Sequence, residues 1–561
     1  MQKCEEGNTS TIFMPTGGSA SKMYSDRLSK SFSSIGKELV FSHVKTDKKH
    51  IRVYACSDLH ADTQRNQDWV RANCVRSARE LEHENDIFSV FILPGDIGTE
   101  LDRLSAIFEI LMKNYDAVAY CIGNHECWRR GTASGGSSLS PEKRDSTTNR
   151  LAEDSVQKVI EVLQCAKAHG VCCGPTRIES TTASSSDPGS IPSSAVILPL
   201  QSWYHSGWDT EQDITNPAFL EVQEVMPFER KWGDFHQCTW PGLAHEQFAS
   251  IKDNDKSLSY AFADLNEPFL YPQAHSIFPS EVVNKKEELV TSPDRGELII
   301  GGGKFTFDSD GQLIEEEDLT TIGSVASSSP ASSTASPPTK KPASTRNFEK
   351  SLQRFRTETA NVNNNSAVLE DTPTNRDENT DELIPSSPIV KSHDTVISFS
   401  HFVPRQELMP EKRFLIEPHL TKVIGSDPLE EQIRRLQPHI HLFGHTHIPI
   451  DMELDGITYI QWPLGYYKES EKQCKPIYQT GPLLVHDSAL GQGKQGIPKN
   501  RPSLTTWWTR YYEEHARDPT IEDLSPWLIS RLNEFAGLVK NAQKAPNKSA
   551  PTPTKSNFNF S

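Results

Sequence analysis

The chain has 561 residues, of which 35% are hydrophobic, a share below that of a protein folded along its whole length. Its formal net charge of −17 disfavours nonspecific nucleic-acid binding, because an acidic surface repels a polyanion. No apolar run approaches the roughly 18 residues of a transmembrane helix, and the N-terminus lacks the apolar core of a secretory signal. We therefore expect a cytoplasmic protein without a membrane span, whose ten cysteines are buried free thiols.

The first predicted elements are a leader and then alternating strands and helices. Residues 1–50 are rich in Ser and Lys and are expected to be a flexible leader. Three short apolar runs follow at 51–56, 87–93 and 117–123, and helix-length segments separate them. Short runs that alternate with such segments predict strand–helix–strand units. In 151–170 the apolar residues recur at helical spacing, which predicts a helix.

The middle of the chain contains two further predicted strands and three segments without a folding pattern. The apolar runs at 195–204 and 394–403 predict the strands. The Ser-rich stretches 131–140 and 179–190 are expected to be surface loops. Residues 320–392 are mostly Ser, Thr, Pro, Asn and acids, which cannot bury enough apolar surface to offset chain entropy, so we expect a disordered insertion.

The insertion divides the predicted folded part into two halves, residues 51–319 and 393–515. The aromatic-rich segment 505–519 is expected to form a helix that docks on the core. Residues 516–561 are expected to form a C-terminal helix and then a disordered tail.

Polar side chains follow five of the apolar runs, at the point where each run ends. If the runs are strands, these side chains lie at carboxyl ends of strands, where α/β proteins bind ligands. Residues that are far apart in the sequence would then converge on one cleft. The motifs are "SDLH" with Asp58 and His60, "PGD" with Asp96, "GNHE" with Asn124, His125 and Glu126, "SH" with His401, and "GHTH" with His445 and His447.

The residue types in these motifs favour a pair of metal ions. Asp, Asn and His offer oxygen and imidazole nitrogen without a thiolate, a set that favours Mn, Fe, Zn or Ni. In Asp58-x-His60 and His445-x-His447, alternate residues of an extended backbone point the same way, so both side chains of each motif can face the cleft. A single strand-end histidine is usually only a capping or solvated residue. Five such motifs in this arrangement predict a metal site.

The ordered set Asp-x-His, Gly-Asp, Gly-Asn-His-Glu, His and Gly-His-x-His resembles the calcineurin-like metallophosphoesterases. The segments "SWYHSGWD", "WPGL", "SHFVPRQELMPEKRFL" and "WPLGYYKE" look like one branch of that superfamily, seen in bacteria and plants. The resemblance covers residues 51–320 and 393–515. It implies an α/β fold, a two-layer β-sandwich flanked by helices, with a dinuclear centre of two divalent metal ions.

The resemblance also implies a role for each motif residue. His125 would be a histidine near the scissile group that binds no metal, and Glu126 would orient it. His439 and His441 would belong to the strand or its surface. One metal would be held by Asp58, His60, Asp96 and His447, and the other by Asp96, Asn124, His401 and His445, with Asp96 bridging.

These roles predict a metal-dependent phosphoesterase that hydrolyses a phosphate ester. Two metals activate a water, and the resulting hydroxide attacks phosphorus. A protonated His125 would assist the leaving group. The substrate would be a small phosphate ester or a phosphoprotein, with a nuclease of the same superfamily and a catalytically inactive scaffold as the competing hypotheses. The insertion could recruit protein partners in either case.

Two further features have more than one interpretation. Arg405 follows His401 by four residues and could bind a substrate phosphate, or it could form a surface salt bridge. Trp203, Tyr204 and His205 could line the cleft or pack beneath it.

Overall fold

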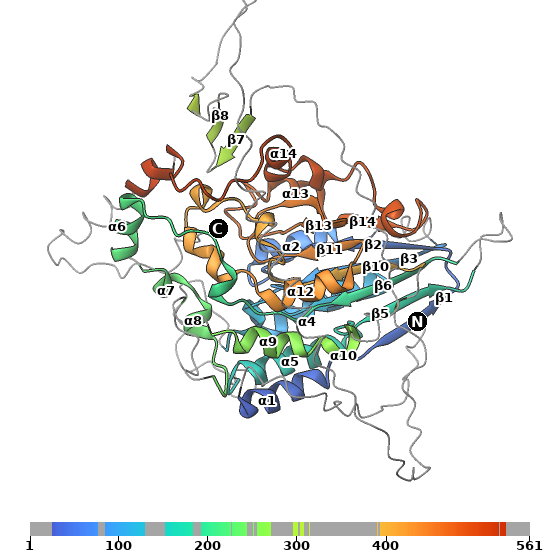
Figure 1. The fold of residues 1–561 in the computed structure, drawn as a ribbon. Coiled ribbons are helices and arrows are strands. Elements are labelled where there is room, and N and C mark those ends of the chain that lie inside the picture. The colour runs from blue at the N-terminus through green and yellow to red at the C-terminus, as the bar shows by residue number, and fades with distance from the viewer. Residues whose placement is uncertain are drawn as a thin grey trace, which may run out of the picture. The chain divides into compact units, whose positions relative to one another are not determined.

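The computed structural model describes the chain from residue 25 to residue 533 with gaps (Figure 1). The chain separates into two units, Glu317–Ser386 and the remainder, and the smaller unit lies outside the described residues. The predicted insertion therefore lies outside them too, except for Val390. The described residues are 25–76, 85–129, 152–182, 192–225, 227–243, 251, 255–270, 296–300, 303–307, 313–314, 390, 393–526 and 528–533.

The larger unit contains a mixed sheet of seven strands, in which four of the six neighbouring pairs are parallel. Parallel pairing buries both faces, and the central strands are accordingly short runs in which every residue is buried. The strands, in spatial order, are β1 (Ser42–Thr46), β5 (Thr176–Ser180), β6 (Ser194–Pro199), β10 (Thr395–Phe399), β11 (Ile440–Phe443), β13 (Ile457–Gln461) and β12 (Ile450–Leu454).

A second sheet has four strands, and its three strands from the predicted strand–helix–strand units are parallel. In spatial order they are β14 (Leu483–Asp487), β2 (His50–Ala55), β3 (Ile87–Pro94) and β4 (Ala117–Cys121). A third, small sheet is antiparallel and consists of β7 (Gly296–Ile300), β8 (Gly303–Phe307) and β9 (Leu313–Ile314).

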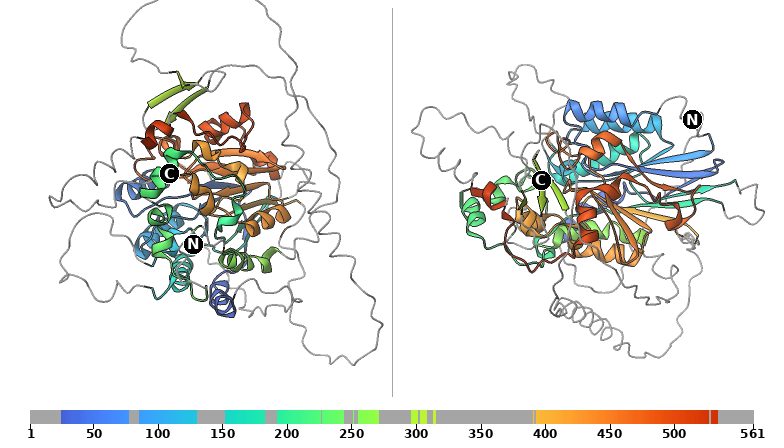
Figure 2. Two further views of the ribbon diagram at one scale, coloured as in Figure 1. Left: turned by 60° about the vertical axis from the view of Figure 1, so that its left-hand side comes forward. Right: turned by 90° about the horizontal axis from the view of Figure 1, so that it is seen from above.

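Helices flank the two main sheets (Figure 2). One cluster of buried side chains includes residues of both sheets. The prediction of an α/β fold with helix-flanked sheets is confirmed at this level. The helices are α1 (Asp26–Gly36), α2 (Gln64–Asn73), α4 (Leu101–Asn114), α5 (Ser155–Ala168), α6 (Pro217–Val225), α7 (Phe228–Lys231), α8 (Asp234–Gln237), α9 (Ser257–Asp264), α10 (Glu267–Leu270), α12 (Asp427–Leu436), α13 (Lys475–Thr480) and α14 (Trp507–Glu514).

The prediction of a flexible leader over residues 1–50 is wrong for its second half. Helix α1 and strand β1 lie there, and residues 1–24 lie outside the described residues. The helix buries Leu28, Phe32 and Ile35, which share one face at the spacing i, i+4, i+7. Ser and Lys occupy the other face. The prediction rested on the Ser and Lys content of the segment, which does not reveal this amphipathic spacing.

Two other expectations, the docked helix and the free cysteines, are confirmed by the described residues. Helix α14 forms within the aromatic-rich segment and packs on β12, where Thr509 Oγ1 accepts a hydrogen bond from the Asp451 amide at 2.8 Å. The nine cysteines of the described residues are free, and seven of them are buried. Among the described helices, none combines the length and apolar character needed to cross a membrane.

Candidate metal centre

The five polar motifs do follow five strands, as predicted, but the strands belong to two different sheets. Strands β2, β3 and β4 of the four-stranded sheet lead to Asp58, Asp96 and Asn124. Strands β10 and β11 of the seven-stranded sheet lead to His401 and His445. The candidate site therefore lies where the carboxyl ends of two parallel strand groups meet, rather than along the edge of a single sheet.

The backbone at the site is not extended. This differs from the extended backbone that was expected for Asp58-x-His60 and His445-x-His447. Non-glycine residues seldom adopt positive φ, and such strain concentrates at functional sites. Seven non-glycine residues of the described chain have positive φ, and five of them are candidate metal ligands. Left-handed turns, not strand alternation, direct these side chains. The five are Asp58 (φ 52°), His60 (41°), Asp96 (53°), His445 (77°) and His447 (55°).

The glycines of the motifs make room for the ligand side chains. A Cβ atom on Gly123 would lie 2.1 Å from Asp96 Oδ1, and a Cβ on Gly444 would lie 2.7 Å from Asp58 Oδ2. Neither distance is compatible with a real side chain. Glycine is therefore required at both positions because a candidate ligand occupies the adjoining space.

Three candidate ligand atoms form one compact group. His401 Nε2 lies 2.9 Å from Asn124 Oδ1 and 3.1 Å from His445 Nδ1, and the Asn124 and His445 atoms are 3.2 Å apart. Atoms that bind one ion at about 2.1 Å lie about 3.0 Å apart when the angle between them is a right angle. The spacing of these three atoms therefore fits a shared metal ion.

Each of the two histidines donates the proton of its other ring nitrogen to a backbone carbonyl. His401 Nδ1 donates to the Pro94 carbonyl at 3.1 Å, and His445 Nε2 donates to the Val423 carbonyl at 3.0 Å. Burial lowers the pKa of His401 to about 4 and also lowers that of His445, so both rings are neutral at pH 7. Their inner nitrogens and the Asn124 oxygen then present only lone pairs to one another. Such an arrangement is repulsive unless a cation lies between the atoms.

A second group of candidate ligands lies beside the first. His60 Nε2 is 2.9 Å from His447 Nε2, which is 3.5 Å from Asp58 Oδ1. His447 Nδ1 donates to Glu469 Oε2 at 2.8 Å, the carboxylate–histidine arrangement that orients metal-binding imidazoles. The donor atoms of Asp58, His60 and His447 all lie within 4.8 Å of one another, close enough to hold a metal ion.

Asp96 lies between the two groups. Its Oδ1 is 3.5 Å from His401 Nε2, and its Oδ2 is 3.9 Å from His60 Nε2. Burial, and then the nearby carboxylates of Glu126 and Asp58, raise the pKa of Asp96 well above its usual range. A cation at this position would remove that electrostatic cost.

Comparison with known proteins adds a distant structural likeness. No family model matches the chain, and no curated protein matches it. The crystal structure of phosphopantetheinyl hydrolase from Mycobacterium tuberculosis is 12% identical, covering 76% of this chain and 93% of that chain, with a TM-score of 0.36. That TM-score is too low to establish a shared fold.

His125 lies beside the candidate ligands, but Glu126 does not orient it as predicted. The His125 ring stacks on Trp128, and its Nε2 is 3.1 Å from the Tyr466 hydroxyl. The carboxylate of Glu126 instead accepts hydrogen bonds from backbone amides of the loop after β3 and from one amide after β4. These are the amides of Asp96, Ile97, Gly98 and Gly123, at 2.6–3.1 Å.

Arg405 does not reach the site, and the salt-bridge interpretation is confirmed. Its guanidinium lies 2.5 Å from Asp455 Oδ2 and 2.7 Å from Glu407 Oε1. Two carboxylates already neutralise this cation, which leaves no reason for it to attract a phosphate. His441 lies within β11, as predicted, and contacts the hydroxyls of Ser398 and Ser400.

The aromatic segment after β6 packs beneath the site and does not line it. Trp203 is buried and stacks on Phe262 and Tyr204. The Tyr204 hydroxyl donates to Asp234 Oδ2 at 3.1 Å. His205 is also buried, and its Nε2 accepts the Asp427 amide.

Three residues of the site were not assigned a role from the sequence. Tyr466 and Glu469 lie in "WPLGYYKE", a segment that was noted only for its family likeness. Asp234 is 1% exposed, and its Oδ1 accepts a hydrogen bond from the side-chain amide of Asn124 at 2.8 Å. No motif surrounds Asp234, so the sequence carried no signal for it.

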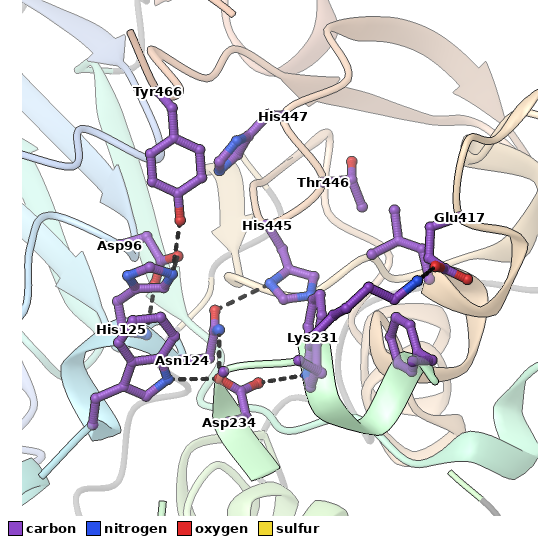
Figure 3. Close-up of a pocket in the computed structure, with 15 residues that line it drawn as sticks. Asp96, Asn124, His125, Lys231, Asp234, Glu417, His445, Thr446, His447 and Tyr466 are labelled. Carbon is purple, nitrogen blue, oxygen red and sulfur yellow. Dashed lines mark hydrogen bonds and ion pairs between the residues drawn. The ribbon is translucent and has the colours of Figure 1, made fainter. Parts of the chain in front are cut away.

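The candidate ligands open onto a pocket (Figure 3). One side of it carries His125 and Tyr466, and the other carries the ion pair of Lys231 with Glu417. The lining residues are Asp96, Asn124, His125, Trp128, Phe228, Lys231, Trp232, Gly233, Asp234, Glu417, Leu420, His445, Thr446, His447 and Tyr466.

Proposed function

We propose that the chain is a calcineurin-like metallophosphoesterase that hydrolyses a phosphate ester with two divalent metal ions. Residues 51–319 and 393–515 would form its catalytic domain, with the two main sheets as layers of a sandwich. The observation that carries the proposal is the convergence of lone pairs from His401, Asn124 and His445 within 3.2 Å of one another. A structural histidine cluster would place a proton between such atoms.

The two ions of this proposal would occupy two neighbouring positions. Asp96 has one carboxylate oxygen toward each group and would be shared. Bound ions would supply an activated water and neutralise charge on the phosphoryl oxygens. The first position would be held by Asp58, His60 and His447, and the second by Asn124, His401 and His445.

His125 is the residue best placed to act on the leaving group. It lines the pocket, and its Nε2 lies 3.7 Å from Asp96 Oδ2 and 3.1 Å from the Tyr466 hydroxyl. A histidine here can hold a proton at Nε2 and pass it to the departing oxygen. Stacking on Trp128, with ring centroids 3.7 Å apart, keeps the imidazole in one orientation.

The test is hydrolysis by the full-length protein after its metals have been removed with a chelator. We expect no turnover of p-nitrophenyl phosphate or its bis-ester by the stripped protein, and recovery on addition of Mn²⁺, Zn²⁺, Fe²⁺ or Ni²⁺. The His401→Ala variant serves as the inactive control. A reloaded protein that binds metal but cleaves neither ester would favour the scaffold hypothesis. Cleavage of DNA or RNA in preference to both esters would favour a nuclease.

A further inference from the structure

The pocket extends beyond the candidate ligands along a wall of apolar side chains. The apolar side chains that line it are those of Trp128, Phe228, Trp232, Leu420 and Tyr466. Phosphate hydrolysis at the metal positions alone needs no such wall. The wall therefore indicates that a bound molecule carries an organic group in addition to phosphate.

Both indoles of the wall are tied to one buried carboxylate. Trp128 Nε1 donates to Asp234 Oδ1 at 2.6 Å, and Trp232 Nε1 donates to Asp234 Oδ2 at 3.0 Å. The nitrogen is the only polar atom of an indole, and in both rings it is already bonded. What the two rings offer a ligand is therefore carbon surface.

The same carboxylate also holds the candidate ligand Asn124, through its amide nitrogen at 2.8 Å. Asp234 thus fixes both indoles relative to a candidate metal ligand. The Trp232 ring lies edge-on to His445, with centroids 5.7 Å apart, and stacks on Phe228 at 5.4 Å. A group bound against these rings is within reach of phosphorus at the metal positions.

The far end of the pocket carries no net charge. Lys231 is paired with Glu417, and Gln223 Nε2 donates to the same carboxylate at 3.0 Å. A lysine with no carboxylate beside it would favour a second phosphate, but a buried ion pair gives no such preference. The charges therefore fit a neutral organic group better than an anionic one.

We propose that this wall is a subsite for an aromatic or otherwise planar apolar group of the phosphate ester, with Asp234 as its positioning residue. The proposal rests on the proposed phosphoesterase function for the position of the phosphate. Stacking surfaces favour planar groups because a flat ring contacts an indole face over its whole area.

Binding of phosphonates, which cannot be hydrolysed, tests the subsite without any turnover. The affinities of 1-naphthylphosphonate and methylphosphonate are measured by calorimetry on the metal-loaded, full-length protein. We expect the naphthyl compound to bind roughly tenfold or more tightly than the methyl compound. In Trp232→Ala this ratio should fall towards one, whereas Trp232→Phe should keep most of it. Trp508→Ala, on α14, is the control for loss of a tryptophan outside the pocket.

Equal affinities in the parent protein would overturn the subsite, and so would a ratio that Trp232→Ala leaves unchanged. Trp232→Phe keeps the ring and guards against a variant that fails to fold. The outcome is separable from the proposed function. A protein that prefers the naphthyl compound but has no esterase activity would support the subsite and contradict the proposed function. A protein that has esterase activity but no naphthyl preference would support the proposed function and contradict the subsite.

Discussion

The amide nitrogen of Asn124 donates to Asp234 across 2.8 Å, and this bond turns the amide oxygen toward His401, 2.9 Å away. Without that bond the amide could rotate and present its NH₂ group to the site. An NH₂ group cannot bind a cation. The buried carboxylate therefore determines whether Asn124 can serve as a ligand.

The first prediction follows for Asp234→Asn. An asparagine has one acceptor oxygen, so its NH₂ group would face two of the donors that now reach the carboxylate. Loss of an orienting partner of this kind typically weakens metal binding about 10- to 100-fold. Competition with a metal chelator measures the affinity, and Asp68→Asn, on an exposed carboxylate of α2, is the matched control. Equal metal affinity in Asp234→Asn and the parent would contradict the proposed role.

The second prediction concerns His125. If it protonates the departing oxygen, His125→Asn should lose about 10²- to 10⁴-fold in kcat/KM on esters of alkyl alcohols. The loss should be much smaller with nitrophenolate, which tolerates negative charge without help. Rates over a series of leaving groups, with metal content measured in parallel, make the comparison. An equal loss across the series with full metal content would exclude proton donation.

The third prediction concerns Gly123, where a Cβ would lie 2.1 Å from Asp96 Oδ1 and 2.5 Å from the Asp96 amide nitrogen. Gly123→Ala should therefore displace Asp96 and greatly reduce metal binding. Gly36→Ala is the matched control, because its Cβ would meet only Leu265 at an ordinary 3.7 Å. The control should bind metal as the parent does, and its free energy of unfolding should lie within about 1 kcal/mol of the parent's. Full metal binding by Gly123→Ala would show that Asp96 is not confined as described.

The sequence predicted the nine motif residues because each stands directly after a short apolar run. Such runs are recognisable as buried strands, and the chemistry of Asp, Asn and His is local information. The sequence did not predict that two sheets contribute to the site, since strand pairing joins residues far apart in the chain. The strands that were not predicted at all are β1, β5, β7, β8, β9, β12, β13 and β14.

The roles of Glu126 and Asp234 also could not be predicted, because they depend on contacts that the fold creates. Glu126 is adjacent to His125 in sequence, which suggested a contact between them, but its carboxylate accepts the Gly123 amide and three amides of the β3 loop. Asp234 acts through Trp232, two residues away, and through three partners at sequence separations of 30 to 110 residues. Only the fold brings those partners together.

The fourth prediction concerns stability against pH. Burial lowers the pKa of His441 from 6.5 to about 3, so the folded protein keeps this ring neutral where the unfolded chain protonates it. The unfolded state then binds more protons, and its free energy falls as the pH drops from 6.5 toward 3. At pH 5 the cost is about 2 kcal/mol.

His441→Asn should therefore give a shallower decline of unfolding free energy between pH 6.5 and pH 4. Chemical denaturation at several pH values measures the slope. His43→Asn, on β1, is the control for exchanging a histidine for asparagine outside the core. If His441→Asn declines as steeply as the parent, burial of this ring does not contribute to acid sensitivity.

The proposed function requires that the five motifs hold two metal ions that share Asp96. The most direct measurement is the number of ions per chain, by elemental analysis of full-length protein that has been stripped, reloaded and freed of excess metal. We expect close to two ions in the parent and one or none in Asp96→Asn, whose amide cannot bridge two cations. A parent protein that holds no ion, or an Asp96→Asn protein that still holds two, would contradict it.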